Sequence, residues 1–302
     1  MVYNPDLYSF SVNDKTNKME NSRRRFFKNA GTGAITLGLA SSILPGNLLA
    51  MNDKMSAGQA DRFKVGIAYW TFVKFKLEPA LEMTERVAVK YICIKDFHLP
   101  INSTPEQIAL FLDKLKAKGI IGYGVGPISM RSEDSVDKAF EYAKNVGVKL
   151  IVAVPNPELL PYVEKKVKEY DFRIAIHNHG IEEGRYPSVE SIYDKVKNFD
   201  TRIGICHDIG YSAQMGFDPA ALTLKYGHRV YEMHIKDMTS NTNDAKDCEI
   251  GRGVIDFPAL VKALRKTKYD GSCSVEMEKD STDPLPGLAE SVGFFRGVLK
   301  AV

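Results

Sequence analysis

Short apolar, β-branched runs alternate with longer amphipathic segments along most of this chain. The short runs have the composition of strands buried in a parallel sheet, whereas apolar residues in the longer segments recur as they do on one face of a helix. Strands are predicted to begin near Phe63, Tyr91, Ile120, Lys149, Phe172, Arg202, Arg229 and Ser272. Helices are predicted over residues 77–89, 104–118, 132–146, 157–170, 188–198, 218–226, 257–267 and 286–299.

Residues at the ends of several predicted helices support these assignments. Thr104 and Asp218 are N-capping residue types, and each stands before a proline, which fits the first turn of a helix. Ser132 is an N-capping residue type at the start of another segment. Gly119 and Gly147 stand where two helices are expected to end, a common place for glycine. These signals divide the chain into strand-then-helix units.

Eight such units, repeating about every thirty residues, predict a closed (β/α)8 barrel of the α/β class. The alternative is an open, doubly wound sheet. That fold usually carries a glycine-rich phosphate loop after its first strand, but Tyr69-Trp70-Thr71 stand at this place. We therefore predict a single (β/α)8 TIM barrel over residues 61–302, without an internal domain boundary. The longest connection, residues 238–255, follows the seventh strand and is expected to cover the mouth of the barrel.

The part of the chain predicted to form the barrel is electrically neutral. The 302 residues include 41 Lys+Arg and 38 Asp+Glu, and the first sixty hold seven and four of these, which leaves 34 of each for residues 61–302. A neutral domain lacks the basic surface that binds nucleic acid, so we expect a small-molecule partner and no nucleic acid. The four cysteines show no C-x-x-C spacing, and no disulfide framework is predicted.

Residues 1–60 have the composition of an export leader. Arg23-Arg24-Arg25-Phe26-Phe27 precede a moderately apolar run, rich in Gly and Ala, over residues 30–50. A basic stretch, an apolar stretch and small residues in this order form a secretory signal, and the adjacent arginines with Phe resemble the twin-arginine type. We expect an exported, periplasmic protein with no stable membrane span after removal of the signal.

Polar side chains end the last four predicted strands. The carboxyl ends of barrel strands lie together and carry the active site in enzymes of this architecture. Two imidazoles and two carboxylates there form a mixed nitrogen and oxygen set that suits one divalent Mn, Zn, Co or Fe ion. The predicted ligands are His177, Asp208, His234 and Glu276.

Three residues near these strand ends are candidates for moving protons. Glu276 is itself a predicted ligand, and His179 projects to the same side as His177 because side chains alternate along a strand. His98 follows the second predicted strand. Imidazole and carboxyl groups can be tuned to titrate near the working pH of an enzyme. For His98 the alternative is a structural role as a cap of the next loop.

Trp70, Lys236 and Arg252 are candidates for contacting a substrate. Trp70 would form an apolar wall for a sugar face, and Lys236, on the same side of its strand as His234, would bind substrate oxygens. Arg252 lies between two glycines in the long connection and would clamp an oxyanion. Structural alternatives stay open for each: core packing for Trp70, an ion pair with Asp237 for Lys236, and a turn for Arg252.

Five motifs carry a family resemblance: Ile-x-x-His-Asn-His-Gly, His-Asp-Ile-Gly-Tyr, Met-His-Ile-Lys-Asp, Gly-Arg-Gly-x-Ile-Asp-Phe-Pro and Val-Glu-Met-Glu. With them residues 61–302 resemble the xylose isomerase-like TIM barrel superfamily, and more narrowly its sugar phosphate isomerase/epimerase members. The resemblance implies a (β/α)8 barrel, and it places the superfamily's metal ligands on the four residues already named. It is much less specific for the reaction.

One ligand position departs from the ketose epimerases of this family. They have a glutamate in place of His177, and it works with the glutamate that matches Glu276 to move protons on opposite faces of the sugar. Tyr211 and Gln214 also stand where many relatives have His and Arg. The resemblance therefore implies a bound metal, but it does not imply the mechanism in which two glutamates move protons on opposite faces of the sugar.

Taken together, the sequence favours a metal-dependent isomerase or epimerase of a sugar or keto-sugar. We expect it to remove a proton α to a carbonyl while the metal stabilises the resulting enediolate. The alternative on the same barrel is a keto-sugar lyase or hydratase of the dehydratase type, which expels a β-substituent after the same proton abstraction. A non-catalytic sugar-binding protein is a third reading, and association into a homo-oligomer stays open.

Overall fold

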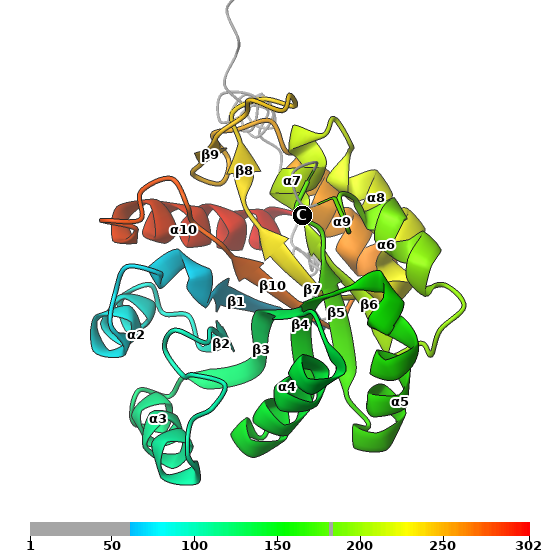
Figure 1. The fold of residues 1–302 in the computed structure, drawn as a ribbon. Coiled ribbons are helices and arrows are strands. Elements are labelled where there is room, and N and C mark those ends of the chain that lie inside the picture. Colours follow the sequence, from blue (N-terminus) through cyan, green and yellow to red (C-terminus); the bar gives the residue numbers. More distant parts are fainter. Residues whose placement is uncertain (1–60, 181–183) are drawn as a thin grey trace, which may run out of the picture. The chain divides into compact units, whose positions relative to one another are not determined.

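The computed structural model describes residues 61–180 and 184–302, and the predicted leader lies outside the described residues. Eight parallel strands form a closed barrel in the order β1-β10-β7-β6-β5-β4-β3-β2 (Figure 1). The strands are β1 (Lys64–Ala68), β2 (Tyr91–Ile94), β3 (Ile121–Met130), β4 (Leu150–Pro155), β5 (Arg173–His177), β6 (Ile203–Asp208), β7 (Val230–Ile235) and β10 (Ser272–Val275). The predicted single (β/α)8 TIM barrel is confirmed.

Helices surround the barrel and connect its strands (Figure 1). They are α2 (Leu77–Arg86), α3 (Pro105–Ala117), α4 (Glu133–Val146), α5 (Leu160–Tyr170), α6 (Val189–Val196), α8 (Pro219–Tyr226), α9 (Phe257–Lys266) and α10 (Leu285–Ala301). The capping prediction is confirmed, because the side chains of Thr104, Ser132 and Asp218 accept backbone N–H groups of the first turn. Across the described ranges, no helix is both long and apolar enough to cross a bilayer.

Several short elements have no counterpart in the predicted pattern. The helix α7 (Ile209–Gln214) directly follows β6, and its six residues are too few to display a helical period. The others are the 3₁₀ turns η1 (Tyr69–Phe72) and η4 (Gly227–Arg229), and the two-stranded sheet of β8 (Asp237–Met238) and β9 (Asp247–Cys248). The 3₁₀ turn η2 (Pro157–Leu159) lies at the start of the helix predicted over residues 157–170.

The register of the barrel brings its polar strand ends to one level. Asp208, the last residue of β6, lies opposite His234 on β7. His234 in turn lies opposite Ser274 on β10, so Glu276 follows two residues beyond the pairing position. His177 ends β5 opposite Cys206, two residues before Asp208. Because side chains alternate along each strand, these polar residues can share the inner face of the barrel mouth.

The buried carboxylate of Asp237 anchors the long connection after β7. Its Oδ1 accepts the backbone N–H groups of Met238 and Ile255, at 2.9 and 3.1 Å. Its Oδ2 accepts those of Gly251 and Gly253, both at 2.9 Å. Glycine is required at 253, since a Cβ there would lie 2.3 Å from Oδ1 of Asp237. The Gly-Arg-Gly motif therefore closes a loop of the scaffold.

Candidate metal centre and substrate pocket

Four buried side chains from β5, β6, β7 and the end of β10 converge inside the barrel. Nε2 of His177 lies 2.9 Å from Nδ1 of His234 and 3.6 Å from Oδ2 of Asp208. Nδ1 of His234 lies 3.2 Å from Oε2 of Glu276. One ligand atom from each of the four residues lies within 4.8 Å of all the others. The structure thus brings the four predicted ligands to a common centre.

This arrangement fits a divalent metal ion. Two ligands bound at right angles at about 2.1 Å lie about 3.0 Å apart, close to the 2.9 Å between the nitrogens of His177 and His234. Oδ1 of Asp208 already accepts the backbone N–H of Tyr211 at 2.9 Å. Its buried Oδ2 accepts no hydrogen bond of good geometry from the described residues, but the ammonium of Lys236 forms an ion pair with it at 3.2 Å. Two nitrogens and two carboxylate oxygens suit Mn, Zn, Co or Fe.

Asn178 joins β5 to β6 beside this centre. Its Oδ1 accepts the backbone N–H of Asp208 at 2.9 Å, and its Nδ2 donates to the carbonyl oxygen of Asp208 at 3.1 Å. The next residue, His179, places its Nδ1 3.0 Å from Nδ1 of His177. The His-Asn-His motif therefore supplies one proposed ligand, a clamp between strands and a second imidazole next to the ligand.

The ammonium of Lys236 lies among the same carboxylates. Its Nζ is 2.9 Å from Oε2 of Glu276, 3.2 Å from Oδ2 of Asp208 and 3.1 Å from Oε1 of Glu278. Lys236 is almost completely buried. It therefore pairs with these three carboxylates instead of Asp237, whose oxygens are taken by backbone N–H groups.

Burial and neighbouring charges determine the ionisation of Glu276, Lys236 and His177. Burial opposes charge on Glu276, but the ammonium of Lys236 and the imidazoles of His234 and His177 together outweigh it and hold the pKa of this carboxyl well below its usual range. Burial also opposes charge on Lys236, yet the Asp208 and Glu276 carboxylates raise the pKa of its ammonium well above the usual value. Burial holds the pKa of His177 well below its usual range. His177 is therefore neutral and keeps a lone pair for a metal.

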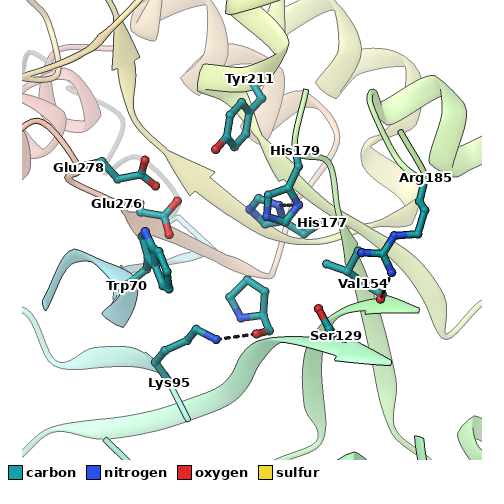
Figure 2. A pocket seen from close by; sticks show the side chains of 11 residues that line it. Trp70, Lys95, Ser129, Val154, His177, His179, Arg185, Tyr211, Glu276 and Glu278 are labelled. Atoms are coloured by element: carbon teal, nitrogen blue, oxygen red, sulfur yellow. Dashed lines mark hydrogen bonds between the residues drawn. The ribbon is translucent and has the colours of Figure 1, made fainter. Parts of the chain in front are cut away.

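A pocket of about 310 Å³ opens onto the centre, at the lower end of the range for ligand sites. His177, His179 and Glu276 line it (Figure 2). Two of them are predicted ligands, His177 and Glu276, and two are predicted proton-transfer residues, His179 and Glu276. Trp70, the predicted apolar wall, also lines the pocket and is 41% exposed. Lys236 contacts Glu276 but is not part of the lining.

Seven further residues line the pocket that were not predicted as site residues: Lys95, Pro127, Ser129, Val154, Arg185, Tyr211 and Glu278 (Figure 2). Lys95 directly follows β2, and Glu278 lies two residues after Glu276. Their positions just after strands could therefore have predicted both as site residues. Arg185 lies in the connection after β5, where periodicity carries no information about side-chain direction.

Two predicted site residues and one predicted loop lie elsewhere. Nε2 of His98 is 2.9 Å from the carbonyl oxygen of Phe75, and its ring packs edge-on against Tyr69, so it contacts the connection after β1 and not the loop that follows it. Arg252 forms two hydrogen bonds with Glu290 on α10, at 2.9 and 2.5 Å. The expectation that residues 238–255 cover the mouth is not met, since they contribute no lining residue to this pocket.

A second polar group lies beneath the ligands. Glu232, two residues before His234 on β7, is fully buried, and burial raises the pKa of its carboxyl to about 7. The hydroxyl of Tyr123 donates to Oε1 of Glu232 at 2.6 Å and also contacts the hydroxyl of Ser274. No hydrogen bond joins Glu232 to His234, because Oε2 of Glu232 and Nε2 of His234 both lack a hydrogen-bond partner among the described residues.

Solved structures of other proteins share this fold. A structure described as IOLI protein with a binding zinc atom aligns with a TM-score of 0.67 and 18% identity, over 79% of this chain and 99% of that chain. A structure of L-ribulose 3-epimerase aligns with a TM-score of 0.63 and 12% identity, over 79% of this chain and 95% of that chain. At these identities the likeness concerns the fold alone.

Sequence comparison adds a relative and a family. The rhizopine catabolism protein MocC of Rhizobium meliloti is 27% identical over 138 residues, which are 40% of this chain and 42% of MocC. The match thus spans less than half of the length of that relative. The family described as xylose isomerase-like TIM barrel matches residues 122–298, more than half of this chain. This range includes all four residues of the candidate metal centre, and the chain therefore belongs to the xylose isomerase-like TIM barrel family.

Proposed function

We propose that this protein is a metal-dependent isomerase or epimerase of a sugar or keto-sugar. The observation that carries the proposal is the convergence of His177, Asp208, His234 and Glu276 beside a pocket of about 310 Å³. Membership of the xylose isomerase-like family supports it. The names of two proteins with a similar fold, an L-ribulose 3-epimerase and a zinc-bound IOLI protein, agree with it.

A divalent cation held by these four residues would polarise adjacent substrate oxygens and stabilise the charge that develops when a proton α to a carbonyl leaves. Residues of the chain handle the proton. Glu276 lines the pocket and stays ionised because Lys236 and the neighbouring imidazoles together lower its pKa, so it is the proposed base. His179, which lines the same pocket, is the proposed partner that returns a proton.

The imidazole of His177 favours one of the two proposed reactions, isomerisation, over epimerisation. Epimerisation needs a second proton-transfer group on the opposite face of the sugar, and in the related ketose epimerases that group is a glutamate at this position. With His177 there, Glu276 is the one carboxylate of that pair. Moving a proton between neighbouring carbons on one face needs no second carboxylate, so Glu276 together with His179 favours isomerisation between an aldose and a ketose.

The test is incubation of Mn²⁺-loaded protein with aldoses and ketoses in D₂O. Deuterium at the carbon next to the carbonyl of a recovered isomer supports the proposal, and loss of a substituent indicates the lyase alternative. Binding of a sugar without any deuterium exchange would favour the third reading, a non-catalytic sugar-binding protein. His234→Gln should abolish exchange, whereas His228→Gln, which changes an exposed histidine outside the site, should not alter it.

Export is proposed on the sequence alone. The arginines and apolar run of residues 22–50 are proposed to act as a twin-arginine signal that delivers the folded barrel to the periplasm.

A further inference from the structure

Two exposed aromatic side chains are in contact beside the pocket. Trp70 lies in η1, directly after β1, and Phe97 follows β2. Their ring centroids are 6.2 Å apart at an interplanar angle of 58°, and the two residues are 41% and 38% exposed. Of the seven large hydrophobic residues that are exposed in the described ranges, only these two are aromatic. Exposed apolar side chains that adjoin one another, unlike scattered ones, mark surfaces that bind a ligand.

The aromatic surface continues from the pocket to the outside. Trp70 lines the pocket, whereas Phe97 contacts Trp70 without being part of the lining. In the view of Figure 2 the indole of Trp70 lies between Glu276 and Lys95. A ligand that is seated at the proposed metal centre and is longer than the pocket therefore leaves it along these two rings.

The ring of Phe97 has a fixed support. Its centroid lies 4.6 Å from that of the His98 ring, at an interplanar angle of 65°. His98 is itself anchored, because its Nε2 contacts the carbonyl oxygen of Phe75 and its ring packs on the buried ring of Tyr69. A ligand that packs on Phe97 therefore meets a ring whose position is already set, which lowers the entropic cost of binding.

Polar groups lie next to the aromatic pair. Nζ of Lys95 is 5.8 Å from the ring centroid of Trp70, and it pairs with Oδ1 of Asp96 at 2.8 Å. The side chain of Asp96 is partly exposed. A sugar ring has an apolar C–H face and a rim of hydroxyl groups, so aromatic rings with a donor and an acceptor beside them suit a sugar ring.

The small size of this surface argues for a small molecule as its occupant. Two side chains cannot supply the roughly 800 Å² that each partner buries in a stable protein interface. The other large hydrophobic residues exposed in the described part of the chain belong to other segments: Leu110, Ile121, Leu224, Val254 and Val302. Because the aromatic pair is continuous with the pocket, its occupant is best explained as a further part of the ligand in the pocket.

We propose that Trp70 and Phe97 form a subsite for a second sugar ring, and that the substrate is a glycosylated sugar or keto-sugar, such as a disaccharide. The unit that carries the carbonyl group lies at the metal centre, and the attached ring packs on Phe97 and Trp70. This inference rests on the proposed function for the first unit and adds the attached ring.

Trp70 is the only tryptophan of the chain, so tryptophan fluorescence reports on this wall alone. The full chain is loaded with Zn²⁺, a d¹⁰ ion without redox chemistry, and titrated with four ketoses. They are D-fructose and three disaccharides that carry one glucose ring on oxygen 3, 4 or 6 of fructose: turanose, maltulose and isomaltulose. At least one disaccharide should change the Trp70 emission and bind about tenfold or more tightly than D-fructose, because its second ring contacts the aromatic pair.

Substitutions then locate this advantage of the disaccharide over D-fructose. Phe97→Ala should reduce it to less than about threefold, whereas Phe97→Tyr keeps an aromatic ring and should retain most of it. The advantage is a ratio of two affinities measured on one variant, so a partial loss of folded protein does not imitate the effect. Leu110→Ala removes an exposed apolar side chain on α3 and should keep the full advantage.

An advantage below about tenfold for all three disaccharides in the parent protein would overturn the subsite, as would failure of all four sugars to bind. Tighter binding that leaves the Trp70 emission unchanged, or that persists in Phe97→Ala, would also overturn it, because the added ring would then lie elsewhere. The proposed function is judged separately by deuterium exchange. Exchange on D-fructose without a disaccharide advantage keeps the function and removes the subsite; an advantage that depends on Phe97, without exchange on any sugar, does the reverse.

Discussion

The ammonium of Lys236 lies 2.9 Å from Oε2 of Glu276, one of the four proposed metal-ligand atoms. The same ammonium is 3.2 Å from Oδ2 of Asp208, another proposed ligand atom. Lys236 thus neutralises the carboxylates that a divalent cation would neutralise, and two positive charges at this separation repel each other strongly in a buried site. The affinity of this site for the proposed metal should therefore depend on Lys236, which is not itself a proposed ligand.

Replacing this lysine should have opposite effects on metal binding and on the metal-free fold. Lys236→Met should raise the affinity for Mn²⁺ by about tenfold or more, because it removes a nearby positive charge. It should lower the Tm of the metal-free protein, because buried Asp208 and Glu276 lose their counter-charge, and Mn²⁺ should restore most of that loss. Calorimetry and thermal unfolding measure both effects. Lys225→Met, at an exposed lysine, is the control, and weaker Mn²⁺ binding by Lys236→Met would mean that Lys236 supports the ligands.

His177→Glu tests whether the departure from the epimerases defines the reaction. Metal should still bind within about tenfold of the parent affinity, because carboxylate oxygen replaces imidazole nitrogen as a ligand. Turnover of the natural substrate should fall about 100-fold or more, since a new base would stand where the parent has none. Metal content and steady-state kinetics give the two readouts. A variant as fast as the parent would mean that position 177 does not separate the two reactions.

Asp237 should matter far more for stability than the neighbouring Arg252. Asp237→Asn leaves one acceptor oxygen for four backbone N–H groups and turns an amide toward them, so about 2–4 kcal/mol of unfolding free energy should be lost. Arg252→Ala breaks an exposed pair with Glu290 and should cost less than about 1 kcal/mol. Urea denaturation compares the two variants. Equal losses would show that Asp237 does not anchor the loop.

The export signal is tested by a conservative double change. Replacing Arg23 and Arg24 by lysine keeps the positive charge but removes the adjacent arginines that define a twin-arginine signal. The double variant should stay in the cytoplasm in a cell fractionation assay, whereas Arg25→Lys alone should still be exported. Normal export of the double variant would rule out this route.

The sequence predicted those site residues whose positions follow from strand geometry. His177 and Asp208 end buried strands, and closure of the barrel brings such ends together without any loop rearrangement. Lys95 and Arg185 were not predicted as site residues, because the direction of a long side chain after a strand depends on carbonyl oxygens of other strands. The role of Asp237 was not predicted either, because its carboxylate accepts backbone N–H groups 14 to 18 residues away in the chain.

The most direct test of the metal centre is anomalous diffraction at the manganese edge from crystals of the Mn²⁺-loaded protein. We expect one strong peak about 2.0–2.3 Å from Nε2 of His177, Oδ2 of Asp208, Nδ1 of His234 and Oε2 of Glu276. In that crystal the ammonium of Lys236 should have moved away from Asp208 and Glu276. Protein that contains manganese but gives no peak between these four atoms would contradict the account.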